Sequence, residues 1–323
     1  IQPESPFITP LQSDTLFGHL AWAIVYEQGE KGLKEVLAEF NSGSPPFLLS
    51  AAFPEGMLPT PVLPPLTREE IDTLAGDTST SNKRKLIEEV KQTKGIKFID
   101  IATFQSLAYD LSPISLTKQL LKILKDSKPV ISQEEVIMHT AIDRISGTAR
   151  EGSLFNHQQT FYRPAARLTI WLKLSDDSWK DKIHRWFRII EGGGFGKRKS
   201  TGLGQFHASD DIIEADSELP QVANPNAFVL LSSYVPKVND PLQGYYHYIV
   251  KRGKLGGPWA LGGRVWKKPL IMFAPGSIFH TDKELAEYYG GLVPEIHYEN
   301  PRIVQYAYAF PLGIRLKQQG GAS

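Results

Sequence analysis

The thirteen residues 192–204, GGGFGKRKSTGLG, constrain the fold of this chain more than any other segment. They hold six glycines, three consecutive cations and two hydroxyl side chains. The pattern predicts an amphipathic helix at 178–192 directly before them and a strand at 202–210 directly after. Each glycine costs conformational entropy on folding, so such a concentration indicates a backbone that turns tightly or comes close to a partner.

The familiar phosphate-binding loops do not fit this glycine-rich loop. A Walker loop fails because Glu191 stands where its first glycine belongs and Arg198 where its Ser or Thr belongs. A dinucleotide fingerprint fails because Lys199 stands where its last glycine belongs. Both motifs also join a strand to a following helix, which is the reverse of the order predicted here.

A phosphodiester backbone fits the loop better than one small phosphate. Glycines expose backbone N–H groups, lysine and arginine neutralise phosphates, and Ser200 and Thr201 can donate to phosphate or sugar oxygens. Phe195 is able to stack on a base. We therefore interpret the loop as a nucleic-acid contact; the alternative is a disordered surface loop with incidental charge.

The rest of the chain reads as a mixture of antiparallel strands and a few helices, which predicts an α+β fold. Helices are expected at 13–29 and 32–40, residues 67–128 look mostly helical, and two strands at 134–144 and 152–163 flank a polar link. An acidic linker near 211–225 is the candidate domain boundary, giving units 1–210 and 211–323. The best strands of the second unit are expected at 226–236, 244–252, 267–279 and 302–314.

Composition excludes several classes of protein. The net charge is only +1, so nucleic-acid binding has to come from a local basic patch. The 323 residues include no cysteine, which rules out disulfides and a thiol nucleophile and is compatible with a cytoplasmic location. No stretch approaches the 18 to 20 apolar residues of a membrane span. The eight histidines show no metal-ligand spacing, so we expect no metal and no cofactor.

Three segments together resemble the RAMP superfamily of CRISPR-associated proteins. GGGFGKRKSTGLGQF looks like its glycine-rich signature, which lies between the last helix and last strand of a ferredoxin-like, RRM-like domain. SDTLFGHLAWA (13–23) resembles the first helix of type III RAMP subunits. AIDRISGTAREGSLF (141–155), followed by QTFYR, resembles a β-hairpin thumb insertion. The similarity is greatest to a subunit of the type III-A (Csm) effector complex and covers most of the chain to about residue 210.

The resemblance implies two ferredoxin-like (RRM-like) domains and a non-catalytic subunit that holds the 5′ repeat-derived handle of the CRISPR RNA. Its implied protein partners are the large polymerase-like subunit and the backbone RAMP subunit, with no membrane contact. The RNA contacts carried over to this chain are Gly193, Gly194, Phe195, Gly196, Lys197, Arg198, Lys199, Ser200, Thr201, Arg144, Arg150, Ser13 and His19. For Ser13 a helix cap, and for His19 a packed core histidine, are competing interpretations.

Several alternatives stay open. The chain is also compatible with the equivalent RAMP subunit of a type III-B complex, or with an α+β protein whose loop binds a nucleotide or a protein. A third alternative is a metal-independent endoribonuclease, for which His139, His157 and His207 are near the proposed RNA surface. A second glycine-rich stretch, KLGGPWALGGRVWKKP (254–269), fits either a second RNA surface or a loop that packs on a partner subunit.

Overall fold

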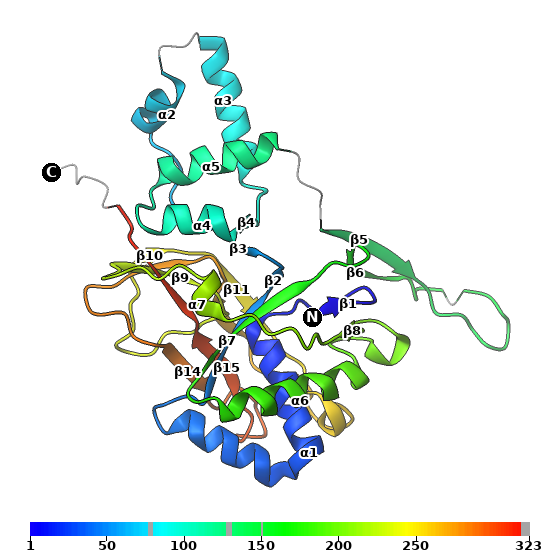
Figure 1. Cartoon of the computed structure of the whole chain (residues 1–323). Coiled ribbons are helices and arrows are strands. Elements are labelled where there is room, and N and C mark those ends of the chain that lie inside the picture. The colour runs from blue at the N-terminus through cyan, green and yellow to red at the C-terminus, as the bar shows by residue number, and fades with distance from the viewer. Residues whose placement is uncertain (77–79, 127–130, 150, 318–323) are drawn as a thin grey trace.

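The computed structural model describes residues 1–76, 80–126, 131–149 and 151–317. The chain has a mixed architecture of helices and small antiparallel sheets, in agreement with the expected α+β class. Figure 1 shows a central body to which both halves of the chain contribute, a helical insertion on one side and a long hairpin that reaches away from the body.

Two long helices cross the central body. They are α1 (Ser13–Asn41) and α6 (Ser178–Gly193), and they pack on each other. The helices predicted at 13–29 and 32–40 form one element, because the backbone leaves helical geometry only at Gly29, where φ is 74°. The N-terminal half also contains two antiparallel strand pairs, β1 (Gln2–Pro3) with β8 (Phe206–His207) and β2 (Phe47–Pro54) with β7 (Leu168–Leu174).

The helical insertion accounts for the predicted helical character of 67–128. Its elements are β3 (Met57–Pro59), α2 (Arg68–Ala75), α3 (Thr80–Thr93), β4 (Phe98–Asp100), α4 (Ile101–Ala108) and α5 (Pro113–Lys125). Short oxygen side chains begin the helices: Thr67 accepts the backbone N–H of Glu70, and Ser112 does the same for Ser115. These caps satisfy N–H groups of the first turn that have no partner within the helix.

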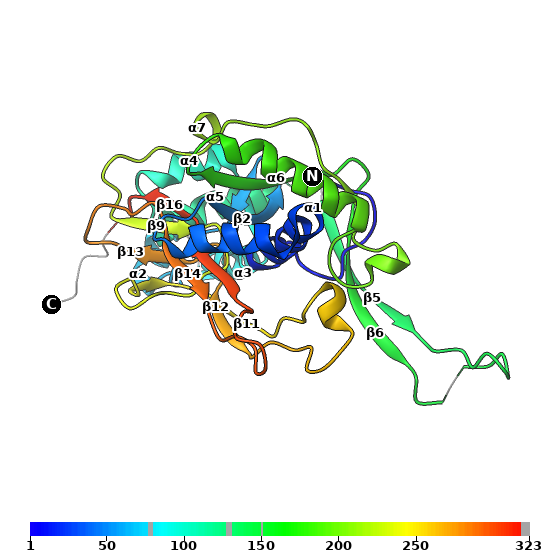
Figure 2. The same ribbon diagram turned by 90° about the horizontal axis from the view of Figure 1, so that it is seen from below.

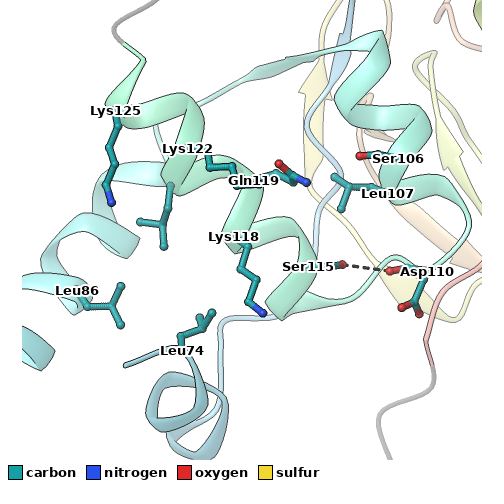
Figure 3. Close-up of a pocket in the computed structure, with 11 residues that line it drawn as sticks. Leu74, Leu86, Ser106, Leu107, Asp110, Ser115, Lys118, Gln119, Lys122 and Lys125 are labelled. Carbon is teal, nitrogen blue, oxygen red and sulfur yellow. Dashed lines mark hydrogen bonds between the residues drawn. The ribbon is translucent and has the colours of Figure 1, made fainter. Parts of the chain in front are cut away.

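A hollow of about 580 Å³ lies within the insertion, between α5 and the helices α2 and α3 (Figure 3). Leucines line it together with Lys118, Lys122 and Lys125 of α5, and Asp110 is its one carboxylate. The helices around it project from the top of the body in Figure 1, away from the loop that follows α6. The described lining of this hollow holds one carboxylate and no histidine, so we place the candidate site elsewhere.

The two strands expected around the polar link form a hairpin, β5 (Ser132–His139) with β6 (Phe155–Tyr162). Its base is fixed to the body where Phe7 pairs with Thr160. In the link, the carboxylate of Asp143 accepts the backbone N–H groups of Ile145 and Ser146 at 2.8 and 3.0 Å. Figure 2 shows the hairpin projecting well beyond the body.

The C-terminal half is dominated by a four-stranded antiparallel sheet in the order β10–β13–β9–β16. The strands predicted in this half are present as shorter strands. The segment 267–279, for example, is divided by a turn at Pro275 and Gly276. The elements are α7 (Ala215–Glu218), β9 (Ala227–Leu230), β10 (Gly244–Tyr245), β11 (Tyr248–Lys251), the 3-10 helix η2 (Gly257–Ala260), β12 (Leu270–Phe273), β13 (Ile278–His280), β14 (Tyr289–Val293), β15 (Gln305–Ala309) and β16 (Pro311–Ile314).

Both halves contribute to the main hydrophobic core. The ring of Phe17 in α1 stacks on Tyr306 of β15, with centroids 4.7 Å apart. The hydroxyl of Tyr306 accepts the backbone N–H of Leu49 at 3.0 Å, and Tyr308 donates to the carbonyl of Phe40 at 2.7 Å. These buried contacts tie β15 to α1 and β2, and they are strong because no water competes for the bonds.

Candidate nucleic-acid interface

The glycine-rich loop is an ordered turn that folds back on the N-terminal segment. The backbone N–H of Phe195 donates to the carbonyl of Gly204 at 2.8 Å, and the N–H of Gly204 donates to the carbonyl of Pro6 at 2.9 Å. Between these anchors lies the 3-10 helix η1 (Lys199–Thr201). The loop therefore presents its cations from a fixed backbone.

Two side chains from outside the loop hold its first turn. Nε2 of His19 in α1 accepts the backbone N–H of Gly196 at 3.0 Å. Oγ1 of Thr9 accepts the backbone N–H of Lys197 at 2.9 Å. Burial, and secondarily the charge of Lys199, lowers the pKa of His19 to about 4, so the imidazole is neutral and able to accept. Thr9 was not expected from the sequence, because nothing in its neighbourhood resembles a motif.

Phe195 does not fit the expected role of stacking on a base. Its side chain is 1% exposed and packs between Phe7, with ring centroids 6.1 Å apart, and His19, with centroids 4.4 Å apart. An apolar ring in a glycine-rich segment is drawn into the core, because burying it is favourable wherever the fold leaves room. Phe195 therefore anchors the loop from beneath.

The polar residues of the loop face solvent. Lys197, Lys199, Ser200 and Thr201 are exposed, and Gly193 is exposed at the end of α6, whereas Gly194 is buried. None of the three cations has a carboxylate within ion-pair distance among the residues that the structure describes. Closely spaced cations without nearby carboxylates on a rigid loop create a local positive potential, although the net charge of the protein is only +1.

The hairpin meets the loop through Arg198. The guanidinium lies 5.1 Å from the centre of the Phe155 ring, and His139 stacks on the same ring with centroids 5.4 Å apart. His157 is 5.7 Å from His139. Desolvation, then the charges of Arg198, Lys197 and His139, lower the pKa of His157. Cations, a phenyl ring and two imidazoles thus share one surface.

One of the predicted contacts lies apart from this surface. Arg144 is exposed in the link at the end of the hairpin that is far from the body. Among the described residues no ion pair joins Arg144 to the adjacent Asp143, whose Oδ1 accepts the two backbone N–H groups of the link, and these bonds lower the pKa of Asp143. Arg150 lies outside the described residues.

Ser13 does not fit the expected RNA contact or the alternative of a helix cap. The N-cap position of α1 is Gln12, and the Ser13 side chain is fully buried. Its hydroxyl accepts the backbone N–H of Ser233 at 2.9 Å. The residue joins α1 to the C-terminal half, a partner 220 positions away that local sequence cannot reveal.

Gly204 is the glycine on which the loop geometry depends, and replacing it with Ala should destabilise the protein by about 2 kcal/mol. Its φ is +70°, and a Cβ there would collide with the carbonyl oxygen of Phe195. Gly202→Ala is the matched control, because φ is +85° but a Cβ would meet nothing within 4 Å. Urea unfolding should show the larger loss for Gly204→Ala. Equal losses would mean that only the backbone dihedral matters at Gly204.

A comparison with models of protein families identifies the family of this chain. Residues 7–207 match the model of the RAMP superfamily. The chain belongs to the RAMP superfamily. The match covers the first helix, the hairpin and the glycine-rich loop, which are the three segments that carried the resemblance. No curated protein sequence matches the chain.

Solved structures share the fold of this RAMP protein along nearly its whole length. A crystal structure of a Csm1–Csm4 cassette in complex with cA4 contains a chain that matches with a TM-score of 0.58 at 18% identity, covering 98% of this chain and 96% of that one. A Csm3–Csm4 subcomplex of a type III-A CRISPR-Cas interference complex matches with a TM-score of 0.58 at 15% identity, covering 98% of each chain.

The described part of this RAMP protein contains no group of three or more His, Cys, Asp or Glu residues positioned to hold a metal ion. His207, one of the three histidines considered from sequence, is 3.0 Å from the carboxylate of Glu191. Within the same residues, no helix is both long and apolar enough to cross a membrane.

Proposed function

We propose that this RAMP protein is a non-catalytic, RNA-binding subunit of a type III CRISPR effector complex. On this proposal it holds the 5′ repeat-derived handle of the CRISPR RNA, as the fourth Csm subunit would in a type III-A complex. The observation that carries the proposal is the rigid loop, whose three cations have no carboxylate partner among the described residues, placed beside the aromatic face of the hairpin. Cations and flat rings on one surface suit single-stranded RNA.

The two structural relatives support the choice of partners. These relatives were solved as assemblies of Csm4 with Csm1 and with Csm3. By analogy, this chain joins a large polymerase-like subunit to a backbone RAMP subunit. We also propose that residues 1–210 and 211–323 are two RRM-like domains and that β5–β6 is the thumb. The equivalent type III-B subunit is the alternative within the same class.

The test is RNA binding by the purified protein at several salt concentrations, with the RNA length followed over time. Labelled single-stranded RNA with a 5′ repeat-derived handle should bind more tightly than RNA of equal length without it, and both should stay intact. Affinity that is equal for the two RNAs would remove the handle from the proposal. Absence of salt-dependent binding would contradict the RNA-binding function itself.

One observation favours a second function, metal-independent RNA cleavage. His139 and His157 lie side by side, and their Nε2 atoms are buried without a hydrogen-bond partner. One imidazole would take the proton of a 2′-hydroxyl as that oxygen attacks the phosphate, and the other would protonate the departing 5′-oxygen. Shortened RNA that is absent in both His139→Ala and His157→Ala would establish this function.

A further inference from the structure

Gly18 lies within α1, and nothing in the described part of the fold requires a glycine at this position. The residue is exposed and helical, and a Cβ built on it would meet no atom within 4 Å. Glycine weakens a helix relative to alanine, because it loses more backbone freedom on folding. The helix would thus be more stable with a side chain at this position. A bare stretch of helix backbone is useful where another molecule has to lie directly against it.

The surroundings of Gly18 are formed by the C-terminal half. Residues 15, 18 and 22 share one face of α1. One turn before Gly18, the ammonium of Lys251 lies 3.1 Å from Oγ1 of Thr15. One turn after it, the indole of Trp22 packs so closely on Gly256 and Gly257 that a Cβ on either would collide with the ring. The second glycine-rich stretch therefore closes over α1 beside Gly18.

The glycine-rich loop contacts the same turn of α1, through the bond between Gly196 and His19. Figure 2 shows the two segments beside the base of the hairpin, the loop in green and the turn that contains η2 in gold. Gly18 is adjacent to His19 in the chain, so the two glycine-rich segments border one short strip of α1. That strip has an open position at its centre.

The second stretch, together with Arg252 just before it, has the chemistry of a single-strand nucleic-acid surface. Arg252 and Lys254 are exposed, and neither has an ion-pair partner in the part of the chain that the structure describes. The guanidinium of Arg252 lies 5.7 Å from the centre of the Trp266 ring, whose side chain is exposed. Trp22 and Trp259 meet edge to face with centroids 6.2 Å apart. Cations with aromatic faces bind phosphates and stack on bases.

We propose that the RNA strand held by the glycine-rich loop crosses α1 at Gly18 and continues onto the second glycine-rich stretch, its sugar–phosphate backbone lying on the bare helix. The inference rests on the proposed RNA-binding function and extends it. It gives residues 254–269 a role as the second wall of one groove. It also explains why α1 keeps a glycine at a position where the fold leaves space for a side chain.

The test compares Gly18→Ala with Gly18→Gln in the full chain, using the labelled handle RNA as the probe. Gly18→Ala should raise Tm by about 2 °C, because it restores helix propensity. Gly18→Gln should keep at least the wild-type Tm, since its side chain enters open space, yet bind RNA at least tenfold more weakly. Gly18→Ser serves as a smaller second blocking variant, should Gly18→Gln lower Tm.

A second measurement locates the strand directly. Handle RNA that contains 4-thiouridine should cross-link to peptides that include Trp22 or residues 254–269, and these products should disappear in Gly18→Gln. Wild-type affinity in both blocking variants would overturn the inference. If both blocking variants bound RNA normally but neutralising the three cations of the loop abolished binding, the proposed RNA-binding function would stand and only this path of the strand would be wrong. If the wild type bound no RNA, both would fall.

Discussion

Neutralising the three cations of the glycine-rich loop is expected to weaken binding of single-stranded RNA about a hundredfold at 0.1 M salt. Each phosphate contact with a single strand contributes about 0.7 to the slope of log K against log salt, so three contacts contribute about two units. The loop backbone is held by His19, Thr9 and Phe7, none of which depends on the cations. The loss should therefore appear in affinity and salt slope, while the thermal stability stays unchanged.

The substitutions suited to this experiment are Lys197→Gln, Arg198→Asn and Lys199→Gln. Arg198 has a φ of 60°, a conformation that asparagine tolerates better than most residues. The matched control removes three exposed lysines elsewhere, by Lys34→Gln, Lys94→Gln and Lys283→Gln, and changes the net charge equally. If the control lost as much affinity as the loop variant, overall charge and not the loop would account for binding.

Acidification is expected to release the glycine-rich loop, because His19 has to be neutral to accept the N–H of Gly196. The pKa of His19 is lowered from 6.5 to about 4 in the folded protein. A lowered pKa on a basic group means that the unfolded chain binds the proton more readily. The contribution of His19 to stability is therefore complete above pH 6.5, falls as the pH drops, and is lost below pH 4. The full shift corresponds to roughly 3 kcal/mol.

His19→Gln isolates this effect from the other seven histidines. The amide oxygen of glutamine can still accept the N–H of Gly196, but the side chain does not titrate between pH 4 and 7. We expect the difference in unfolding free energy between wild type and variant to change over that range, and RNA affinity to follow it. Identical pH profiles of the two proteins in urea unfolding would contradict a role for the neutral imidazole.

Local patterns predicted the elements that frame the site better than the contacts within it. The helix before the glycine-rich loop and the two strands of the hairpin could be anticipated, because apolar periodicity and glycine position are local signals. The roles of Phe195 and Ser13 could not. Whether an aromatic ring turns inward depends on Phe7, and whether a serine caps or bridges depends on Ser233, residues that are far away in the sequence.

The shared core has a consequence for how the chain is made. α1 leaves the ribosome well before Lys251, which binds Thr15 and follows it 236 positions later. At about 5 to 20 residues per second, α1 waits roughly ten to fifty seconds for that partner. Throughout this interval Phe17 lacks Tyr306 of β15, on which its ring stacks in the finished protein. The nascent chain is thus a natural client for a chaperone that shields apolar helices, and fragments that stop before β15 are expected to aggregate.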